Sequence, residues 1–179
     1  MCPTLRFTYE DYLQLPENCR YEIVDGDPFM VPAPTPNHQR VSRKLGRFLD
    51  DYVTERNLGE VFHAPCDLLL SDFDVVQPDI FYISNERMSI IKEKNIQGTP
   101  DLVVEIVCAG TAFRDRGIKQ KLYARAGVKE YWIVDPEART IDVMALGPHG
   151  YLLVGVYRKE ETLQSPPLPG LAIPLGRIF

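Results

Sequence analysis

Long apolar runs are missing from this chain of 179 residues. No stretch approaches the ~20 apolar residues that a membrane-spanning helix needs. The first residues, MCPTLRFTYEDYLQL, lack the basic start and the apolar stretch of a secretory signal. Hydrophobic residues make up 45% and charged residues 25% of the chain, as in ordinary soluble globular proteins. We therefore expect a cytoplasmic protein without a membrane partner.

Cysteine, histidine and net positive charge are also scarce. The four cysteines (Cys2, Cys19, Cys66 and Cys108) have none of the close spacings of a metal site, so we interpret them as reduced thiols. The three histidines are far apart in the sequence, which argues against a His-rich zinc site. The net charge is −5, so a nucleic-acid partner would have to meet a local basic face.

Several common motifs are absent as well. The sequence contains no GxGxxG or GxxxxGK[ST], which excludes the usual dinucleotide and P-loop phosphate sites, and no GxSxG or HExxH. It also contains no internal repeat. A chain of this length nevertheless buries roughly 70% of the surface that it exposes when unfolded, which is enough for one domain without disulfides or structural metal.

Hydrophobic spacing predicts an α/β fold. In the first half we expect a helix over 7–15 with Thr8 as N-cap, a hairpin of strands 21–24 and 29–31, and a long helix from Pro36, capped by Thr35, to near Gly59. Strands are expected over 61–63, 67–70 and 80–83, followed by a short helix from Ser84 through Lys94.

The second half contains a strand–helix–strand pattern. Residues 101–107 (DLVVEIV) are nearly all apolar and β-branched, which is typical of a strand buried on both faces. A helix from Thr111 to near Gly127 and a strand over 131–134 follow, which predicts a parallel strand pair. Residues 140–157 predict an antiparallel hairpin, and the apolar, Pro-rich end predicts an extended arm that docks on the body.

We expect a single α/β domain over 1–179, with a mixed central β-sheet flanked by helices. Within it, residues 1–35 form an N-terminal helix and hairpin, 36–136 form the core, and 137–179 form a C-terminal hairpin and arm.

A carboxylate inside the buried strand is the first sign of chemistry. Glu105 would cost several kcal/mol as an ion in that strand unless it is paired or bound to metal. The alternatives are a pair with a core arginine or an exposed strand end. Asp79 and Asp101 each follow a proline at the start of a strand. Asp101 and Glu105 lie on one strand, roughly 13 Å apart, which is too far to share a metal.

Asp79 lies on a different strand, so two neighbouring strands can bring it to Glu105. We therefore interpret Asp79 as functional and Asp101 as a residue of the strand start. Two carboxylates with waters suit Mg²⁺ or Mn²⁺, and such an ion can activate water and neutralise charge on a phosphodiester. Two interpretations of Glu22, in YEIVDG, stay open: a further metal ligand, or a solvent-facing residue of the hairpin.

The predicted helix after Glu105 offers two lysines. At ~100° per residue, Lys119 falls on the apolar face of that helix and Lys121 points away from it. Asp115 is four residues before Lys119, so an ordinary Asp–Lys helix pair is the alternative. A lysine on a packed face favours a functional role, in which it orients the attacking water. Tyr123 is expected to be a core residue.

A basic stripe runs along the first long helix. Arg40, Arg43, Lys44 and Arg47 recur at helical spacing opposite the apolar face. Such a stripe can follow a phosphate backbone, although a solvated helix face is the more common explanation. Further positive charge comes from the second helix, at Arg114, Arg116, Lys121 and Arg125.

Taken in order, these segments resemble a known family. The pieces are YEIVDG (21–26), PAPTPNHQRVSRKL (32–45), VVQPDIFYIS (75–84), PDLVVEIV (100–107), TAFRDRGIKQKLYARAGVKEYWIVDP (111–136) and PGLAIPL. They are similar to the Uma-two family of restriction endonucleases, within the PD-(D/E)xK nuclease superfamily. The resemblance implies that residues 1–179 form a single restriction-endonuclease-like domain with an α/β core. It also implies divalent-metal phosphodiester cleavage, with Asp79 and Glu105 as metal-binding carboxylates and Glu22 as an assisting one.

The chain departs from the superfamily pattern at two places. The superfamily lysine usually lies two residues after the strand acid, where this chain has Val107. The resemblance implies that the lysine has moved to the following helix, which fits Lys119. The segment CAGT (108–111) differs from the expected Ser-Pro-Ser-Thr-like turn.

The leading hypothesis is an endonuclease that uses Mg²⁺ (or Mn²⁺) to cleave DNA. Asp79, Glu105 and Lys119 would be its catalytic residues, Asp79, Glu105 and Glu22 would hold the metal, and the basic stripe would bind DNA. A homodimer is expected because a double-strand cut needs two active sites. One alternative is a nuclease-like module that binds nucleic acid or protein without cleavage. Another is a structural homodimer formed through the C-terminal arm, for which truncation after Gly155 would give a monomer.

Overall fold

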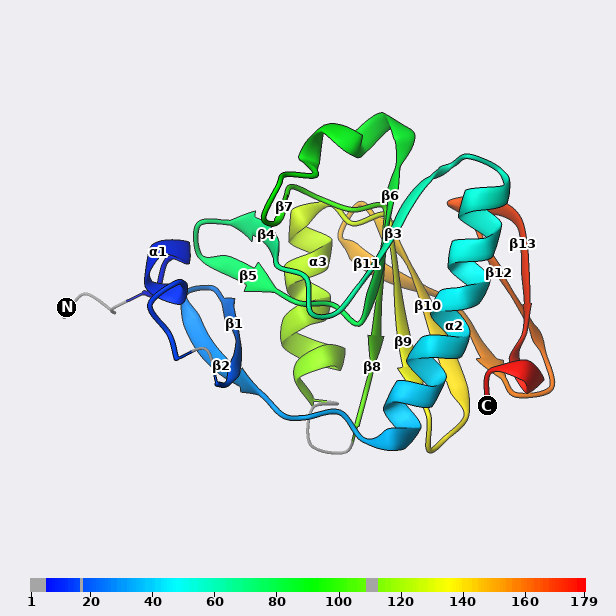
Figure 1. Ribbon diagram of the computed structural model, residues 1–179. Helices are drawn as coiled ribbons and strands as arrows, with labels where there is room; N and C mark the ends of the chain where they lie inside the picture. Colours follow the sequence, from blue (N-terminus) through cyan, green and yellow to red (C-terminus); the bar gives the residue numbers. More distant parts are fainter. Residues whose placement is uncertain (1–5, 17, 109–112) are drawn as a thin grey trace.

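A six-stranded mixed sheet forms the centre of this computed structural model, which describes residues 6–16, 18–108 and 113–179 (Figure 1). The strand order is β11-β10-β9-β8-β6-β3. The strands are β3 (Gly59–His63), β6 (Ile80–Ser84), β8 (Leu102–Ile106), β9 (Glu130–Asp135), β10 (Thr140–Gly147) and β11 (Gly150–Arg158). β8 and β9 are parallel, as predicted, and all other neighbours in this sheet are antiparallel.

A second sheet of five strands carries the N-terminal hairpin. Its order is β2-β1-β5-β4-β7, with β1 (Arg20–Val24), β2 (Asp27–Val31), β4 (Leu68–Ser71), β5 (Asp74–Val76) and β7 (Ile96–Gln97). The hairpin β1–β2 is confirmed, and both turn residues have positive φ, 55° at Asp25 and 81° at Gly26. This backbone matches the twist of the strands in a two-residue hairpin. The sequence did not indicate β5 or β7.

Helices cover both faces of the six-stranded sheet, with α2 (Pro36–Glu55) on one side and α3 (Gln120–Ala126) on the other (Figure 1). Thr35 caps α2, since its side-chain oxygen accepts from the His38 backbone N at 3.2 Å. The helix ends at Glu55, before the predicted Gly59, because Asn57 already adopts a left-handed backbone with φ 51°. One π-helical segment, η2 (Arg114–Lys119), leads directly into α3, and Gly127 ends it at φ 83°.

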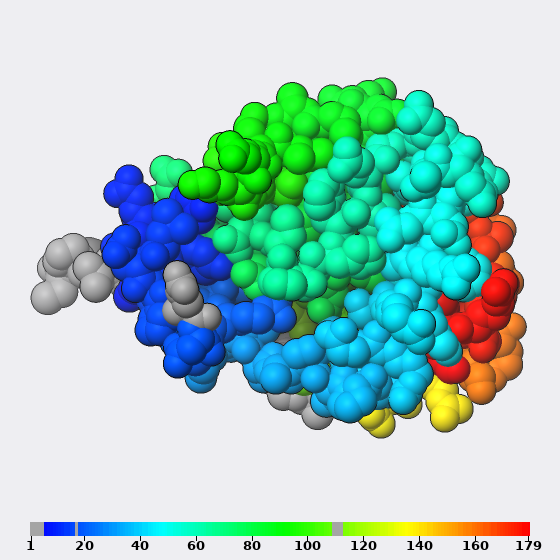
Figure 2. Space-filling view, in the orientation of Figure 1, coloured from blue at the N-terminus to red at the C-terminus, as the bar shows by residue number. Residues whose placement is uncertain are grey.

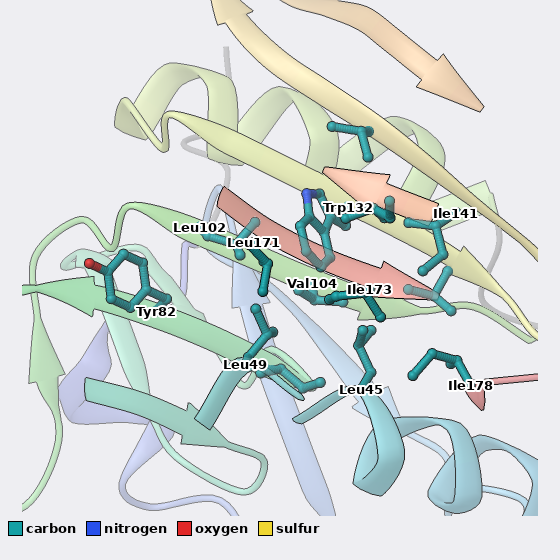
Figure 3. Close-up of a cluster of buried hydrophobic side chains, with 14 of the residues drawn as sticks. Leu45, Leu49, Tyr82, Leu102, Val104, Trp132, Ile141, Leu171, Ile173 and Ile178 are labelled. Carbon is teal, nitrogen blue, oxygen red and sulfur yellow. The ribbon is translucent and has the colours of Figure 1, made fainter. Parts of the chain in front are cut away.

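The apolar residues form two clusters, one on each face of the central sheet. On one face, Leu45 and Leu49 of α2 point toward Val104 and Trp132 of the sheet (Figure 3). On the other face, Leu122 and other apolar residues of α3 pack between the central sheet and the five-stranded sheet. Because alternate residues of a strand face opposite sides, β8 places Val104 toward α2 and Glu105 toward α3.

The C-terminal segment docks on the body as expected, but it folds into a hairpin instead of an extended arm. β12 (Thr162–Ser165) pairs with β13 (Leu168–Pro174), and the short helix η3 (Leu175–Arg177) follows. Figure 2 shows the end of this segment, in red, lying against α2, in cyan. Its buried side chains complete the cluster under α2: Leu163, Leu168, Leu171, Ile173, Leu175 and Ile178.

Two short helices differ from their predicted bounds. α1 (Tyr9–Tyr12) is shorter than 7–15, although Thr8 caps it as predicted. A 3₁₀ helix, η1 (Asn85–Ile90), follows Ser84 and ends before Lys94. The predicted helix start at Thr111 falls outside the described residues, and so does most of CAGT.

Within the described ranges, no helix is long and apolar enough to cross a bilayer. Within those ranges, Cys19 and Cys66 are free thiols, as the sequence indicated. Cys2 lies outside them.

Candidate active site

Asp79 and Glu105 meet where β6 and β8 run side by side. The antiparallel register pairs Ile80 with Val104 and Phe81 with Val103. Continuing this register by one residue sets Asp79 opposite Glu105, and such cross-strand neighbours have Cβ atoms about 5 Å apart. Asp79 also binds β8 directly, since its Oδ2 accepts from the Ile106 backbone N at 2.8 Å. Both carboxylates line one pocket.

Lys119 occupies the inner wall of this pocket. Lys119 is 4% exposed, and its Nζ donates to Oε1 of Glu105 at 2.9 Å and to Oε1 of Glu22 at 2.8 Å. Its Nζ is also 3.9 Å from Oδ1 of Asp115, one turn earlier in η2. The π-helical winding of η2 carries both residues inward, and such segments are frequent at functional sites. Lys121, by contrast, is exposed.

Glu22 links the N-terminal hairpin to this cluster. The glutamate is buried, which settles the open alternative against a solvent-facing residue. Besides Lys119, its Oε1 accepts from the Gln77 backbone N at 2.9 Å. Its Oε2 lies 3.7 Å from Nη1 of Arg114. The three acids and the lysine therefore come from four separate segments of the chain.

Tyr123 belongs to both the core and the site. The ring is fully buried in the cluster between α3 and the sheet, as expected. Its hydroxyl donates to Oε1 of Glu105 at 2.6 Å, so the same oxygen is held by Lys119 and Tyr123. This double contact fixes the orientation of the Glu105 carboxylate.

The charges of the cluster shift the ionisation of its members. Burial raises the pKa of Glu105 to about 8, although Lys119 opposes the rise. Burial alone would lower the pKa of Lys119, but the carboxylates of Glu105 and its neighbours raise it above its ordinary value. The surrounding carboxylates therefore favour the charged form of Lys119, whereas burial disfavours the charged form of Glu105.

The donor set suits a hard divalent cation, although no cluster of three or more His, Cys, Asp or Glu is arranged as a metal site in the part of the chain that the structure describes. The hydrogen bonds among the described residues use Oδ2 of Asp79 and Oε1 of Glu105, and none reaches Oδ1 or Oε2. Two carboxylate oxygens on adjacent strands fit Mg²⁺ or Mn²⁺, which keep several waters. The residues present therefore fit the ion that the sequence predicted.

Asp101 lies apart from the pocket, at the opposite end of β8. Its Oδ2 accepts from the Ser84 backbone N at 2.9 Å, and its Oδ1 is 2.7 Å from Nζ of Lys129. These contacts explain why a buried aspartate is tolerated there. They agree with its interpretation as a residue of the strand start.

Sequence reasoning missed two residues of the site, His38 and Gln77. His38 Nε2 lies 3.1 Å from Oδ2 of Asp79, and the ring lines the pocket. Gln77 contacts Arg20, Tyr12 and Asp67 through its side chain and Glu22 through its backbone. In the sequence, Gln77 stands out only as part of the VVQPDIFYIS segment. No spacing rule connects His38 with a partner 41 residues away.

Three of the four basic residues in the stripe on α2 contact other residues of the chain. Lys44 Nζ donates to the Ile178 carbonyl oxygen at 3.0 Å, so this lysine ties α2 to the C-terminal segment. Arg47 Nε is 3.5 Å from Oδ2 of Asp51. Arg40 Nη1 donates to Asn37 at 3.2 Å, and Arg43 is exposed. A role of these four residues in nucleic-acid binding stays a prediction.

The mixed sheet with helices on both faces defines a restriction-endonuclease-like α/β protein. A family model described as "Putative restriction endonuclease", that of Uma2, matches residues 9–176, and the chain belongs to this family. No curated protein matches the sequence. A solved structure, a putative nuclease belonging to DUF820 from Anabaena variabilis, matches with a TM-score of 0.81 at 18% identity over 97% of each chain, which establishes the likeness of fold.

Proposed function

We propose that this protein is a cytoplasmic endonuclease that cleaves DNA with Mg²⁺ or Mn²⁺. One observation carries the proposal: Asp79 and Glu105 face the same pocket from adjacent strands, with the buried Lys119 against Glu105. A buried cluster of this kind is costly to a fold and is typical of functional sites. Membership of the restriction endonuclease family supports the same reaction class.

In this proposal each residue has a distinct task. Asp79 and Glu105 would hold the cation with Glu22 as an assisting ligand, and Glu22 also holds Lys119 in place. The cation, when bound, supplies Lewis acidity and neutralises charge on the phosphodiester. The Lys119 ammonium orients the attacking water and stabilises negative charge in the transition state. Tyr123 and Gln77 keep the two glutamates in place.

DNA is the proposed substrate, and α2 is the proposed contact. Arg40 and His38 lie within one turn of each other on this helix, so the basic residues begin beside the pocket. Phosphate contacts by arginine and lysine position a duplex without reading its sequence. A homodimer is proposed because each chain offers one pocket and a double-strand break needs two.

The test is cleavage of supercoiled plasmid by wild type, Lys119→Met and Lys121→Met, each with Mg²⁺, Mn²⁺ or EDTA. Methionine keeps the length of the lysine stem without its charge. Lys121 is the matched control because it lies two residues away and is exposed. We expect metal-dependent nicking by wild type and Lys121→Met, and a loss of about 100-fold or more in Lys119→Met. Circular dichroism would check that each variant is folded.

Two outcomes would contradict the proposal. Wild type that binds plasmid equally well in EDTA and never cleaves it would favour a binding module. Cleavage that survives Lys119→Met and is lost in Lys121→Met would keep the nuclease and reverse the assignment of the lysine.

A further inference from the structure

The Asp79 carboxylate is held by two donors, and only one of them is backbone. Oδ2 accepts from the Ile106 backbone N at 2.8 Å and lies 3.1 Å from Nε2 of His38, at which distance the ring N–H donates to it. The two side chains are 13% and 17% exposed. With both donors on Oδ2, the plane of the carboxylate is fixed and Oδ1 stays available to the pocket.

The N-terminal cap of α2 fixes the backbone position of His38. His38 is in the first turn of α2, and its backbone N donates to the capping hydroxyl of Thr35 at 3.2 Å. Its Nδ1 is buried and has no hydrogen-bond partner among the described residues. The contact with Asp79 is therefore the one polar contact that the ring makes in that part of the chain.

A second His–Asp pair in the same chain provides a contrast. His63 Nε2 lies 3.2 Å from Oδ2 of Asp50, between β3 and α2, with side chains 38% and 48% exposed. Neither residue of this pair lines the pocket, and the pair has the solvent access of an ordinary surface pair. The His38 pair differs in burial and in lining the pocket beside Glu105.

We propose that His38 is a positioning residue that orients Asp79 for cation binding. Outer partners of metal-binding carboxylates fix ligand geometry in this way. Because His38 belongs to α2, it also connects the helix proposed to contact DNA with the proposed cation site. The inference rests on the proposed function, since it assigns the cation to Asp79.

The test compares His38→Gln with His38→Met in the full chain. The two replacements have similar length, but only glutamine retains an N–H that can donate to Asp79. His63→Met is the control for loss of a His–Asp pair. The probe is Mn²⁺ alone, titrated by isothermal calorimetry, with thermal melting of the metal-free proteins recorded in parallel.

We expect His38→Met to weaken Mn²⁺ affinity about 10- to 100-fold. His38→Gln should recover most of this loss, and His63→Met should bind as wild type does. A purely structural role would lower the melting temperature of His38→Met without this difference in affinity between the two replacements.

The outcomes separate this inference from the proposed function. If both His38 variants bind Mn²⁺ with the affinity of wild type, His38 does not position Asp79, and the nuclease proposal stands. If wild type binds no Mn²⁺, the proposed cation site is wrong, and the role of His38 is overturned with it.

Discussion

Glu130 is a buried carboxylate that the candidate site does not use. The residue lies at the start of β9 and is fully buried. Its Oε1 accepts from Nε1 of Trp132 and, at 2.8 Å, from Oγ of Ser165, while Oε2 has no partner within the described ranges. Burial raises the pKa of Glu130 to about 7, although these two hydrogen bonds oppose the rise.

The raised pKa predicts that ionisation of Glu130 destabilises the fold. The folded state holds the proton to a higher pH than the unfolded chain does, so this contribution to stability is present below the unfolded pKa and is lost as pH rises through the folded pKa. Between about pH 4 and pH 8, the unfolding free energy of wild type should fall by about 3 kcal/mol more than that of Glu130→Gln.

Urea unfolding of both proteins across that range measures the difference. Comparison with the variant removes the titration of all other groups, provided that they behave alike in both proteins. Parallel pH profiles of the two proteins would show that Glu130 ionises in the folded state as easily as in the unfolded chain.

The residues of the site differ in how clearly the sequence indicates them. Glu105 and Lys119 are conspicuous because each interrupts an apolar pattern, in a buried strand and on a packed helix face. His38 gives no such signal, since it lies among polar residues at the start of a helix and its partner is distant in sequence. Its role depends on tertiary geometry that periodicity does not report.

Helix α2 has an apolar face and a basic face. The apolar residues Val41, Leu45 and Leu49 are buried against the sheet. The basic residues lie on the remaining surface, close to the pocket at the start of the helix. If α2 follows a phosphate backbone, its arginines release counterions on binding, and each contact contributes about 0.9 to the salt slope on duplex DNA.

Replacement of Arg40, Arg43 and Arg47 by glutamine should therefore reduce the slope of log affinity against log salt by about 2 to 3. Fluorescence anisotropy with a labelled duplex at several salt concentrations measures this slope. Lys92→Gln with Lys94→Gln is the control, because these exposed lysines follow η1, at the far end of the molecule from the start of α2 (Figure 1). An unchanged slope in the arginine variant would identify the stripe as a solvated helix face.

Long elements are predictable because their periodicity is sustained, whereas short ones depend on their partners. β5 has three residues and β7 has two, so neither offers a pattern that distinguishes a strand from a loop. Their strand geometry comes from pairing with β4. The predicted end of α2 is wrong for a different reason. Asn57, like glycine, tolerates a left-handed backbone, whereas the sequence alone favours Gly59 as the end of the helix.

The C-terminal segment is part of the core of the molecule. Six aliphatic side chains of β12, β13 and the residues after them are buried under α2. Burial of one such side chain stabilises a fold by about 1.5–3 kcal/mol, so the segment contributes roughly 9–18 kcal/mol. That amount is comparable to the whole net stability of a domain, which is about 5–15 kcal/mol.

Truncation after Gly155 should therefore unfold the protein. Circular dichroism and size-exclusion chromatography of the truncated chain would test this. The control is wild type, which we expect to melt in one cooperative transition as a single domain, because both apolar clusters share the central sheet. A truncated chain with a native spectrum and a sharp melting transition would contradict the expectation.

The site brings together distant parts of the chain, so it cannot form until most of the chain has been synthesised. Glu22 and Lys119 meet although they are 97 residues apart. While a ribosome is still making the chain, the lysine that Glu22 and Glu105 require is not yet in place, and the emerging polypeptide has no active site. If the chain is the proposed nuclease, it gains the lysine of its site only after residue 119 has been translated.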